Sequence, residues 1–121
     1  MDIQPTLKGE IGSSETEGDP FTFLSVVCKG NVLSIVVQYS GGCEKHAFRC
    51  IGSPMISKSL PPRRSIHLIH INNKDQCKKL VRDTLHIDIT AFAYTNEIGS
   101  EIILDLTGWK NSINYSYSKN N

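Results

Sequence analysis

Alternation of apolar and polar residues with a period of two is the feature that most limits what this chain can fold into. Residues 31–39 read NVLSIVVQY, which places Leu33, Ile35 and Val37 on one face of an extended segment. Residues 85–89 (LHIDI) repeat the pattern. A period of two is typical of strands with one buried face, so we expect an all-β protein.

Further β-forming segments are separated by turn residues. They lie at 21–28, 46–51, 65–71, 101–106 and 113–117. We therefore expect an antiparallel β-sandwich of about seven strands over residues 21–117, with an open barrel as the main structural alternative. One short helix or turn is expected near 74–83, because Cys77, Leu80 and Val81 recur at the i, i+3, i+4 spacing of a helix face.

Charge divides the chain unevenly. Residues 1–20 carry five acids and one base, and residues 21–121 carry twelve bases and seven acids. The first segment has no apolar period, so it is predicted to be a flexible acidic leader before a single domain at 21–117. It also lacks the basic start and apolar run of a signal peptide. The polar residues 118–121 are expected to fray.

Composition and motifs argue against several classes of function. The net charge of +1 offers no global field for nucleic acid or membrane. No apolar run approaches the roughly 20 residues of a membrane span. The sequence contains no G-x-S-x-G motif, no phosphate-binding loop and no close carboxylate pair on one strand face. We therefore expect a non-enzymatic protein that uses no cofactor.

Basic residues cluster between positions 58 and 82, where Asp75 is the only acid. The basic face that they predict consists of Lys58, Arg63, Arg64, Lys74, Lys78, Lys79 and Arg82. Surfaces that bind nucleic acid normally interleave aromatic residues for stacking, and this stretch has none. The cluster is interpreted either as a solvated face or as a docking face for an acidic partner.

Cysteines and histidines carry the only chemical signal. Cys43 and His46 have the spacing C-x2-H, and His70 and Cys77 have the spacing H-x6-C. Four such ligands suit zinc, although six intervening residues exceed the usual spacing. Alternatively, Cys43 and Cys77 form a disulfide that closes a loop of about 35 residues and contributes roughly 4 kcal/mol. Buried free thiols are the third interpretation, and the spacing leaves all three open.

The other cysteines and histidines are less informative. Cys28 and Cys50 form a second disulfide if their strands are neighbours, and otherwise act as small buried hydrophobic residues. His46 and His70 share strand faces with apolar residues and are expected to point inward. His67 and His86 fall on the faces opposite the apolar residues and are expected to face solvent.

Residues 39–48 (YSGGCEKHAF) resemble the Y-S-G-G-C-x-x-H-x-F segment of NigD-like proteins, which are exported lipoproteins of Bacteroidetes. Further on, residues 68–70 (LIH), Cys77 and residues 84–89 (TLHIDI) are similar to that family's L-I-H, downstream Cys and T-L-x-F-D-L stretch. The match covers about 39–90.

The chain departs from the family pattern at two places. Ile71 stands where the family usually has Asp, and Ile87 replaces an aromatic residue. In the family, the matched part is a C-terminal β-sandwich domain, and the resemblance implies no catalytic activity. The resemblance implies an extracytoplasmic location, either periplasmic or associated with the outer membrane. Membrane contact would then come only through a lipid anchor outside this chain.

The resemblance also favours the Cys43–Cys77 disulfide over zinc, because both cysteines fall in the matched segments. It implies a cell-envelope module with a binding or structural role, an unknown protein or envelope partner, and a link to bacteriocin systems. Two alternatives stay open. One is an immunity or inhibitor-like protein that docks an acidic partner through the basic face. The other is a zinc-binding protein that uses Cys43, His46, His70 and Cys77.

Overall fold

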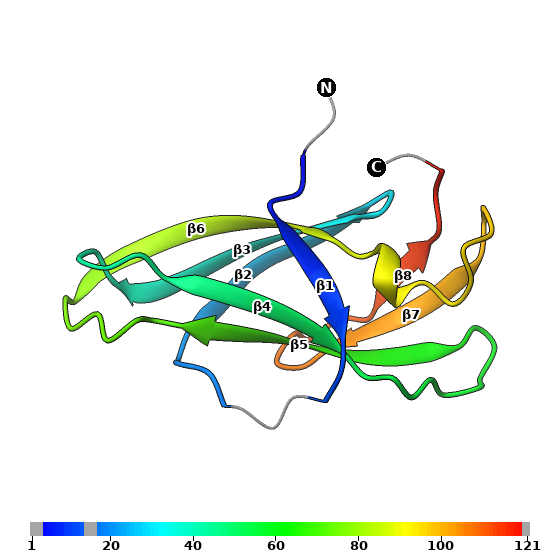
Figure 1. The fold of residues 1–121 in the computed structure, drawn as a ribbon, viewed down its shortest axis with the longest axis horizontal. Helices are drawn as coiled ribbons and strands as arrows, with labels where there is room; N and C mark the ends of the chain where they lie inside the picture. The colour runs from blue at the N-terminus through cyan, green and yellow to red at the C-terminus, as the bar shows by residue number, and fades with distance from the viewer. Residues whose placement is uncertain (1–3, 14–16, 120–121) are drawn as a thin grey trace.

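A computed structural model describes residues 4–13 and 17–119, and the chain within these ranges is all-β (Figure 1). The strands are β1 (Leu7–Ile11), β2 (Thr22–Lys29), β3 (Val32–Gly41), β4 (Ala47–Gly52), β5 (Arg63–Ile71), β6 (Lys79–Asp88), β7 (Glu101–Leu106) and β8 (Ile113–Ser116). A short 3-10 turn, η1 (Thr90–Phe92), precedes β7. The expected all-β class is confirmed. Within the described ranges, no helical segment has the length and hydropathy needed to cross a bilayer.

The strands form one mixed sheet in the order β2-β3-β6-β1-β4-β5-β7-β8, which curls into a nearly closed, barrel-like shape (Figure 1). Four strand pairs are antiparallel: β2–β3, β3–β6, β4–β5 and β7–β8. Three are parallel: β1–β4, β1–β6 and β5–β7. The expected antiparallel sandwich of seven strands is therefore wrong in its architecture, since the structure has one mixed sheet of eight strands. The open-barrel alternative is more similar to this sheet. The reason is that β1 joins two smaller sheets edge to edge instead of leaving them stacked.

The strand β1 lies in the segment predicted to be a flexible leader. Gly9 pairs with Cys50 of β4, and Leu7 pairs with Ile87 of β6. The expected boundary at residue 20 is therefore corrected for Leu7–Ile11, while residues 1–3 and 14–16 lie outside the described part of the chain. The sequence LKGEI alternates, with Leu7 and Gly9 partly buried and Lys8 and Glu10 exposed, but five residues are too few for this pattern to stand out in an acidic segment.

Ser118, the first residue of the segment that was expected to fray, is held by hydrogen bonds. Asn31 is 2% exposed and its amide nitrogen donates to the carbonyl of Ser118 (2.6 Å). The backbone N–H of Ser118 and the hydroxyl of Tyr115 both donate to Asn31 Oδ1, at 3.0 and 2.7 Å. Residues 120–121 lie outside the described part. One buried amide therefore ties Ser118 to the start of β3.

The prediction of a short helix or turn near 74–83 is wrong for residues 79–83. Residues 79–83 begin β6, which pairs with β3 along ten positions from Lys79↔Gly41 to Asp88↔Val32. Leu80 is 66% exposed, so the helical spacing of apolar residues did not mark a buried face. A long antiparallel ladder outweighs the weak helical preference of a ten-residue segment. Residues 74–78 form a loop.

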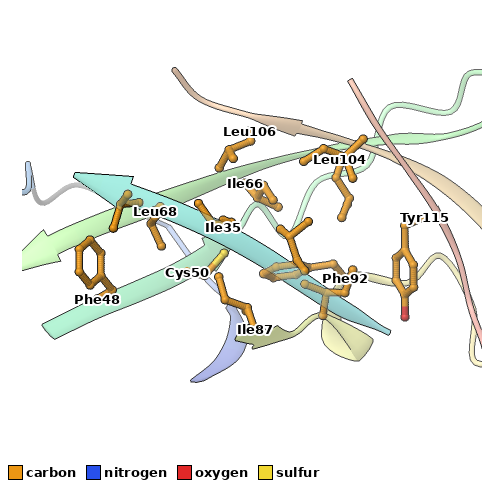
Figure 2. Close-up of a cluster of buried hydrophobic side chains, with 14 of the residues drawn as sticks. Ile35, Phe48, Cys50, Ile66, Leu68, Ile87, Phe92, Leu104, Leu106 and Tyr115 are labelled. Carbon is orange, nitrogen blue, oxygen red and sulfur yellow. The ribbon is translucent and has the colours of Figure 1, made fainter. Parts of the chain in front are cut away.

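The core lies inside the barrel and follows the predicted alternation of β3. Leu33, Ile35 and Val37 are fully buried. Phe92 of η1 is also fully buried among the core side chains (Figure 2). A Cβ atom placed on Gly9 of β1 would lie 2.5 Å from the Phe92 ring. Glycine at this position therefore lets β1 approach the core closely.

We predict that Gly9→Ala destabilises the protein by about 1–3 kcal/mol, because the new methyl group overlaps a buried ring. Gly12→Ala is the matched control, since a Cβ there would meet only the Ile51 side chain at 3.9 Å. Urea denaturation of both variants and the parent measures the difference. Equal stability of the two variants would show that β1 does not pack against Phe92.

Candidate functional site

Two histidines and one aspartate form a buried, hydrogen-bonded chain at one end of the barrel. We call it the His–His–Asp chain (His46, His70 and Asp75). His46 Nδ1 lies 2.7 Å from His70 Nε2, and His46 Nε2 lies 2.8 Å from Asp75 Oδ2. His70 Nδ1 lies 3.0 Å from the carbonyl oxygen of Pro20. The side chains of His46 and Asp75 are 2% and 0% exposed. Both histidines point inward, as predicted.

Four segments bring these groups together. His46 directly precedes β4, His70 lies near the end of β5, and Asp75 lies in the loop between β5 and β6. The antiparallel pairing of β4 and β5 sets His70 opposite Phe48, two residues after His46. Pro20 lies on the segment that leads into β2, and the N–H of the preceding Asp19 donates to the carbonyl of His70 (2.7 Å).

Aromatic rings enclose the two imidazoles. The ring of Tyr39 stacks on His46 with centroids 4.4 Å apart, and the ring of Phe48 stacks on His70 at 4.6 Å. Burial, together with the charges of Asp83 and Asp75, raises the pKa of Tyr39. These rings limit the access of water, so the polar groups depend on one another for hydrogen bonds.

Gly41, at the end of β3, makes the close approach possible. A Cβ atom at this position would lie 2.7 Å from His46 Nε2 and 2.9 Å from Asp75 Oδ2. Any side chain here would therefore displace the imidazole or the carboxylate. The glycine is needed for space rather than for an unusual backbone angle.

Asp75 is the acceptor on which the site is built. Its Oδ2 accepts from the backbone N–H groups of Glu44 (3.0 Å) and Cys43 (3.2 Å), and its Oδ1 accepts from Cys77 N–H (3.0 Å). The Glu44 N–H and then the His46 side chain contribute most to holding the pKa of this carboxyl well below its usual range. Asp75 is therefore ionised at neutral pH and fixes two loops at once.

The predicted disulfide between Cys43 and Cys77 is present and confirmed, with Cα atoms 5.8 Å apart. The Sγ atoms and an Asp75 carboxylate oxygen lie within 4.8 Å of one another, a spacing that a metal could use. The disulfide, however, consumes both thiolates, and His46 and His70 hydrogen-bond to each other. The zinc alternative is therefore contradicted in this structure.

The possible second disulfide is wrong, because Cys28 and Cys50 are free thiols. Cys28 lies on β2 and Cys50 on β4, and three strands separate them in the sheet. Burial raises the pKa of Cys28 to about 11 and that of Cys50 to about 12. Such thiols form little thiolate at neutral pH and react slowly.

The predicted basic face is not one surface. Lys58, Arg63 and Arg64 lie at the start of β5, whereas Lys74, Lys78, Lys79 and Arg82 lie beyond its end. Arg64 is only 6% exposed and donates to the carbonyl of Phe92 (3.2 Å). Arg63 forms an ion pair with Asp105 (2.7 Å). The face is divided because the nine residues of β5 separate the two groups by roughly 30 Å.

Exposed lysines nevertheless gather around the disulfide. We call this set the lysine rim (Lys45, Lys74, Lys78 and Lys79). Lys45 joins it because its carbonyl accepts a hydrogen bond from the Asn73 side chain. Gly42 lies close to Lys79, since a Cβ atom there would be 3.0 Å from that side chain. Sequence reasoning missed Lys45, which lies outside the basic run.

The backbone beneath the lysine rim is held in an unusual conformation. Asn73 and Lys74 have φ angles of 54° and 59°, in the left-handed region that side chains other than glycine rarely adopt. The Asn72 side chain accepts the Lys74 N–H (3.0 Å), and Asp19 accepts the Asn72 N–H (2.7 Å). Non-glycine residues stay in this region only where their surroundings impose it, so the loop presents its lysines in one arrangement.

Comparisons place this fold among known structures. No protein-family model matches the chain, and no curated protein matches it in sequence. A NigD-like immunity protein from Bacteroides caccae superposes with a TM-score of 0.63 and 17% identity, over 93% of this chain and 59% of that protein. This chain has the NigD-like fold. The sequence resemblance is thus confirmed at the level of the fold.

Two further solved structures are similar in fold to this chain. A DUF1344 protein of unknown function from Bacteroides vulgatus has a TM-score of 0.59 and 14% identity, over 94% of this chain and 57% of that protein. A protein described as toxin-related from Parabacteroides distasonis has a TM-score of 0.52 and 13% identity, over 93% of this chain and 61% of that protein. The chain therefore spans less than two thirds of each of these proteins.

We predict that Cys43→Ala/Cys77→Ala lowers the free energy of unfolding by about 2–4 kcal/mol, because the unfolded chain loses its cross-link. Urea denaturation without reductant measures the loss. A Cys28→Ala variant is the control and should lose stability when reductant is added, as the parent does. If reductant leaves the parent unchanged, or an unreduced digest lacks the Cys43–Cys77 peptide pair, the disulfide does not support the fold.

We also predict that Asp75 makes the protein sensitive to acid. Because its pKa is lowered in the folded state, its contribution is complete above the unfolded value near 3.9 and is lost as the pH falls toward the folded value. Asp75→Asn should therefore flatten the dependence of unfolding free energy on pH below about 5. Glu97→Gln changes an exposed carboxylate and should leave the slope as it is. Identical slopes for all three proteins would contradict this role.

Proposed function

We propose that the protein is a non-enzymatic module of the cell envelope that binds a protein partner in an immunity-type system linked to bacteriocins. The observation that carries this proposal is the structural likeness, over 93% of the chain, to a NigD-like immunity protein. A second structural neighbour is described as toxin-related. An immunity role with a protein partner is therefore favoured over a purely structural one.

The geometry of the site supports a non-enzymatic role. The hydrogen bonds of the His–His–Asp chain run from the Pro20 carbonyl to a carboxylate that is itself saturated with donors. Among the described residues, no serine, threonine or cysteine nucleophile is hydrogen-bonded to His46 or His70. Nucleophilic catalysis at this site would need such a pair within hydrogen-bond reach. Ser34 Oγ does lie 2.8 Å from His86 Nδ1, but that pair joins β3 to β6 and is separate from the His–His–Asp chain.

The Cys43–Cys77 disulfide supports an extracytoplasmic location, because such bonds persist in oxidising compartments. We propose a periplasmic or outer-membrane-associated lipoprotein of a Bacteroidetes species. The source organisms of the structural neighbours support this placement.

The lysine rim supports docking of an acidic protein surface. Its four lysines are exposed, and the loop that bears two of them, Lys74 and Lys78, is pinned by the disulfide and by Asp75. Positive charges on a rigid loop steer a negative partner and lose little conformational entropy on binding. This smaller surface replaces the larger basic face expected from the sequence.

We predict that Lys78→Glu/Lys79→Glu weakens partner binding at least about tenfold and reduces its salt dependence, because the reversed charges repel an acidic surface. The probes are the purified products of the genes adjacent to that of this protein, tested by isothermal titration calorimetry at two salt concentrations. Lys58→Glu/Lys119→Glu is the matched control, with the same change in net charge away from the rim.

Two results would overturn the proposal. One is that none of these gene products binds the unmodified protein. The other is that the rim variant and the control variant bind equally well, which would place the interface elsewhere on the surface.

A further inference from the structure

The His–His–Asp chain contains one hydrogen bond more than its neutral imidazoles and its carboxylate can supply. Three contacts, at 3.0, 2.7 and 2.8 Å, link Pro20 O, His70, His46 and Asp75 in series. Each contact needs one proton between its two heavy atoms. A neutral imidazole carries one ring proton and a carboxylate carries none, so the neutral set provides two protons for three hydrogen bonds.

The position of the first proton follows from the Pro20 carbonyl, which can only accept. His70 Nδ1 must therefore carry a proton. If His70 is neutral, its Nε2 is an acceptor and His46 Nδ1 must donate to it. The third proton then has to lie between His46 Nε2 and Asp75 Oδ2.

The carboxylate of Asp75 binds that third proton only weakly. Asp75 accepts N–H groups from Glu44, Cys43 and Cys77, and these hydrogen bonds favour the ionised form. They keep its pKa well below the usual range. The imidazole of His46 lies directly against this negative charge, whereas His70 is one ring further away. An adjacent carboxylate stabilises a protonated imidazole.

We propose that His46 is a buried imidazolium whose Nε2 proton clamps the lysine-rim loop to the barrel through Asp75. Loss of this proton would leave a nitrogen lone pair facing a carboxylate oxygen at 2.8 Å, so the contact would become repulsive. The loop would then lose one of its anchors to the core. The regulatory consequence is that partner binding weakens as the pH rises, and this consequence rests on the proposed function. The assignment of the proton to His46 does not depend on the proposed function.

Other titratable groups lie on the elements around the site and make no hydrogen bond to His46. They are Asp19 on the segment before β2, Tyr39 on β3, Glu44 and Lys45 before β4, Arg49 on β4, Lys74 and Lys78 in the loop, and Lys79 and Asp83 on β6. Arg49 is paired with Glu10, and Asp19 accepts the Asn72 N–H. The lysines and Glu44 are exposed, so solvent and salt screen their charges. Asp75 is therefore the carboxylate that determines the state of His46.

Nuclear magnetic resonance of the full chain labelled with 15N-histidine tests the proposal. Near neutral pH we expect both ring nitrogens of His46 to carry protons, and His70 to carry one on Nδ1 only. Once the third proton is removed, amide exchange at Cys43, Glu44 and Cys77 should be at least about tenfold faster after correction for intrinsic rates. Two results would overturn the assignment. One is that the three hydrogen bonds of the His–His–Asp chain contain only two protons, and the other is that the third proton lies on Asp75 or on His70.

Two variants isolate the cause. Asp75→Asn removes the negative charge that stabilises the imidazolium but keeps an oxygen that can accept the N–H groups of Cys43 and Glu44, so His46 should lose the second ring proton that it carries in the unmodified protein. Glu44→Gln removes an exposed neighbouring charge but keeps the backbone N–H, so the imidazolium should persist. Equal loss of the proton in both variants would mean that general electrostatics, and not Asp75, holds it.

These measurements need no binding partner, so they separate the two proposals. Failure of every adjacent gene product to bind would remove the proposed docking surface and leave the buried proton standing. A neutral His46 in the unmodified protein would remove the clamp, while rim-dependent binding could still be observed. The spectra of the unmodified protein decide the matter even if Asp75→Asn does not fold.

Discussion

The insertion of β1 between β6 and β4 is the constraint on which the rest of the architecture depends. Strands β2, β3 and β6 form one ladder, and β4, β5, β7 and β8 form another. Only β1 hydrogen-bonds to both, in parallel with each. Gly9 lets this strand pass against the buried Phe92 ring, so backbone pairing and core packing are satisfied together. The described sheet becomes barrel-like because a short segment with little apolar character completes it.

The end of this barrel determines what the molecule can present to a partner. The end of β3, the start of β4 and the loop between β5 and β6 meet there, and one carboxylate, Asp75, joins them. The disulfide adds a covalent link between the same two loops. Two kinds of constraint therefore fix the lysine rim: a cross-link that is independent of pH, and a hydrogen-bonded chain that depends on it. A surface held in this way can bind without first becoming ordered.

Several site features could be anticipated from the residues, and others could not. The inward orientation of His46 and His70 followed from strand alternation, because neighbouring apolar residues mark the buried face. Asp75 gave one local hint: it precedes Cys77 by two residues, a spacing at which an aspartate commonly caps its own turn. Its hydrogen bonds to Cys43, Glu44 and His46 join residues about 30 positions apart, and no local sequence pattern indicates such contacts. The prediction of one basic face from residues 58–82 failed for a related reason, because residues close in sequence lie at opposite ends of β5.

The sequence by itself determined the all-β class and the buried face of β3, because a period of two directly records which side chains avoid water. With the family resemblance, it also indicated the Cys43–Cys77 bond. Only the tertiary structure decided that residues 7–11 form the joining strand, that residues 79–83 extend a ladder instead of a helix, and that two imidazoles share a chain with Asp75. The physical reason is that these features depend on backbone hydrogen bonds and polar contacts between distant segments. Such interactions are specified by which strands become neighbours, and a local pattern of hydrophobicity does not record that choice.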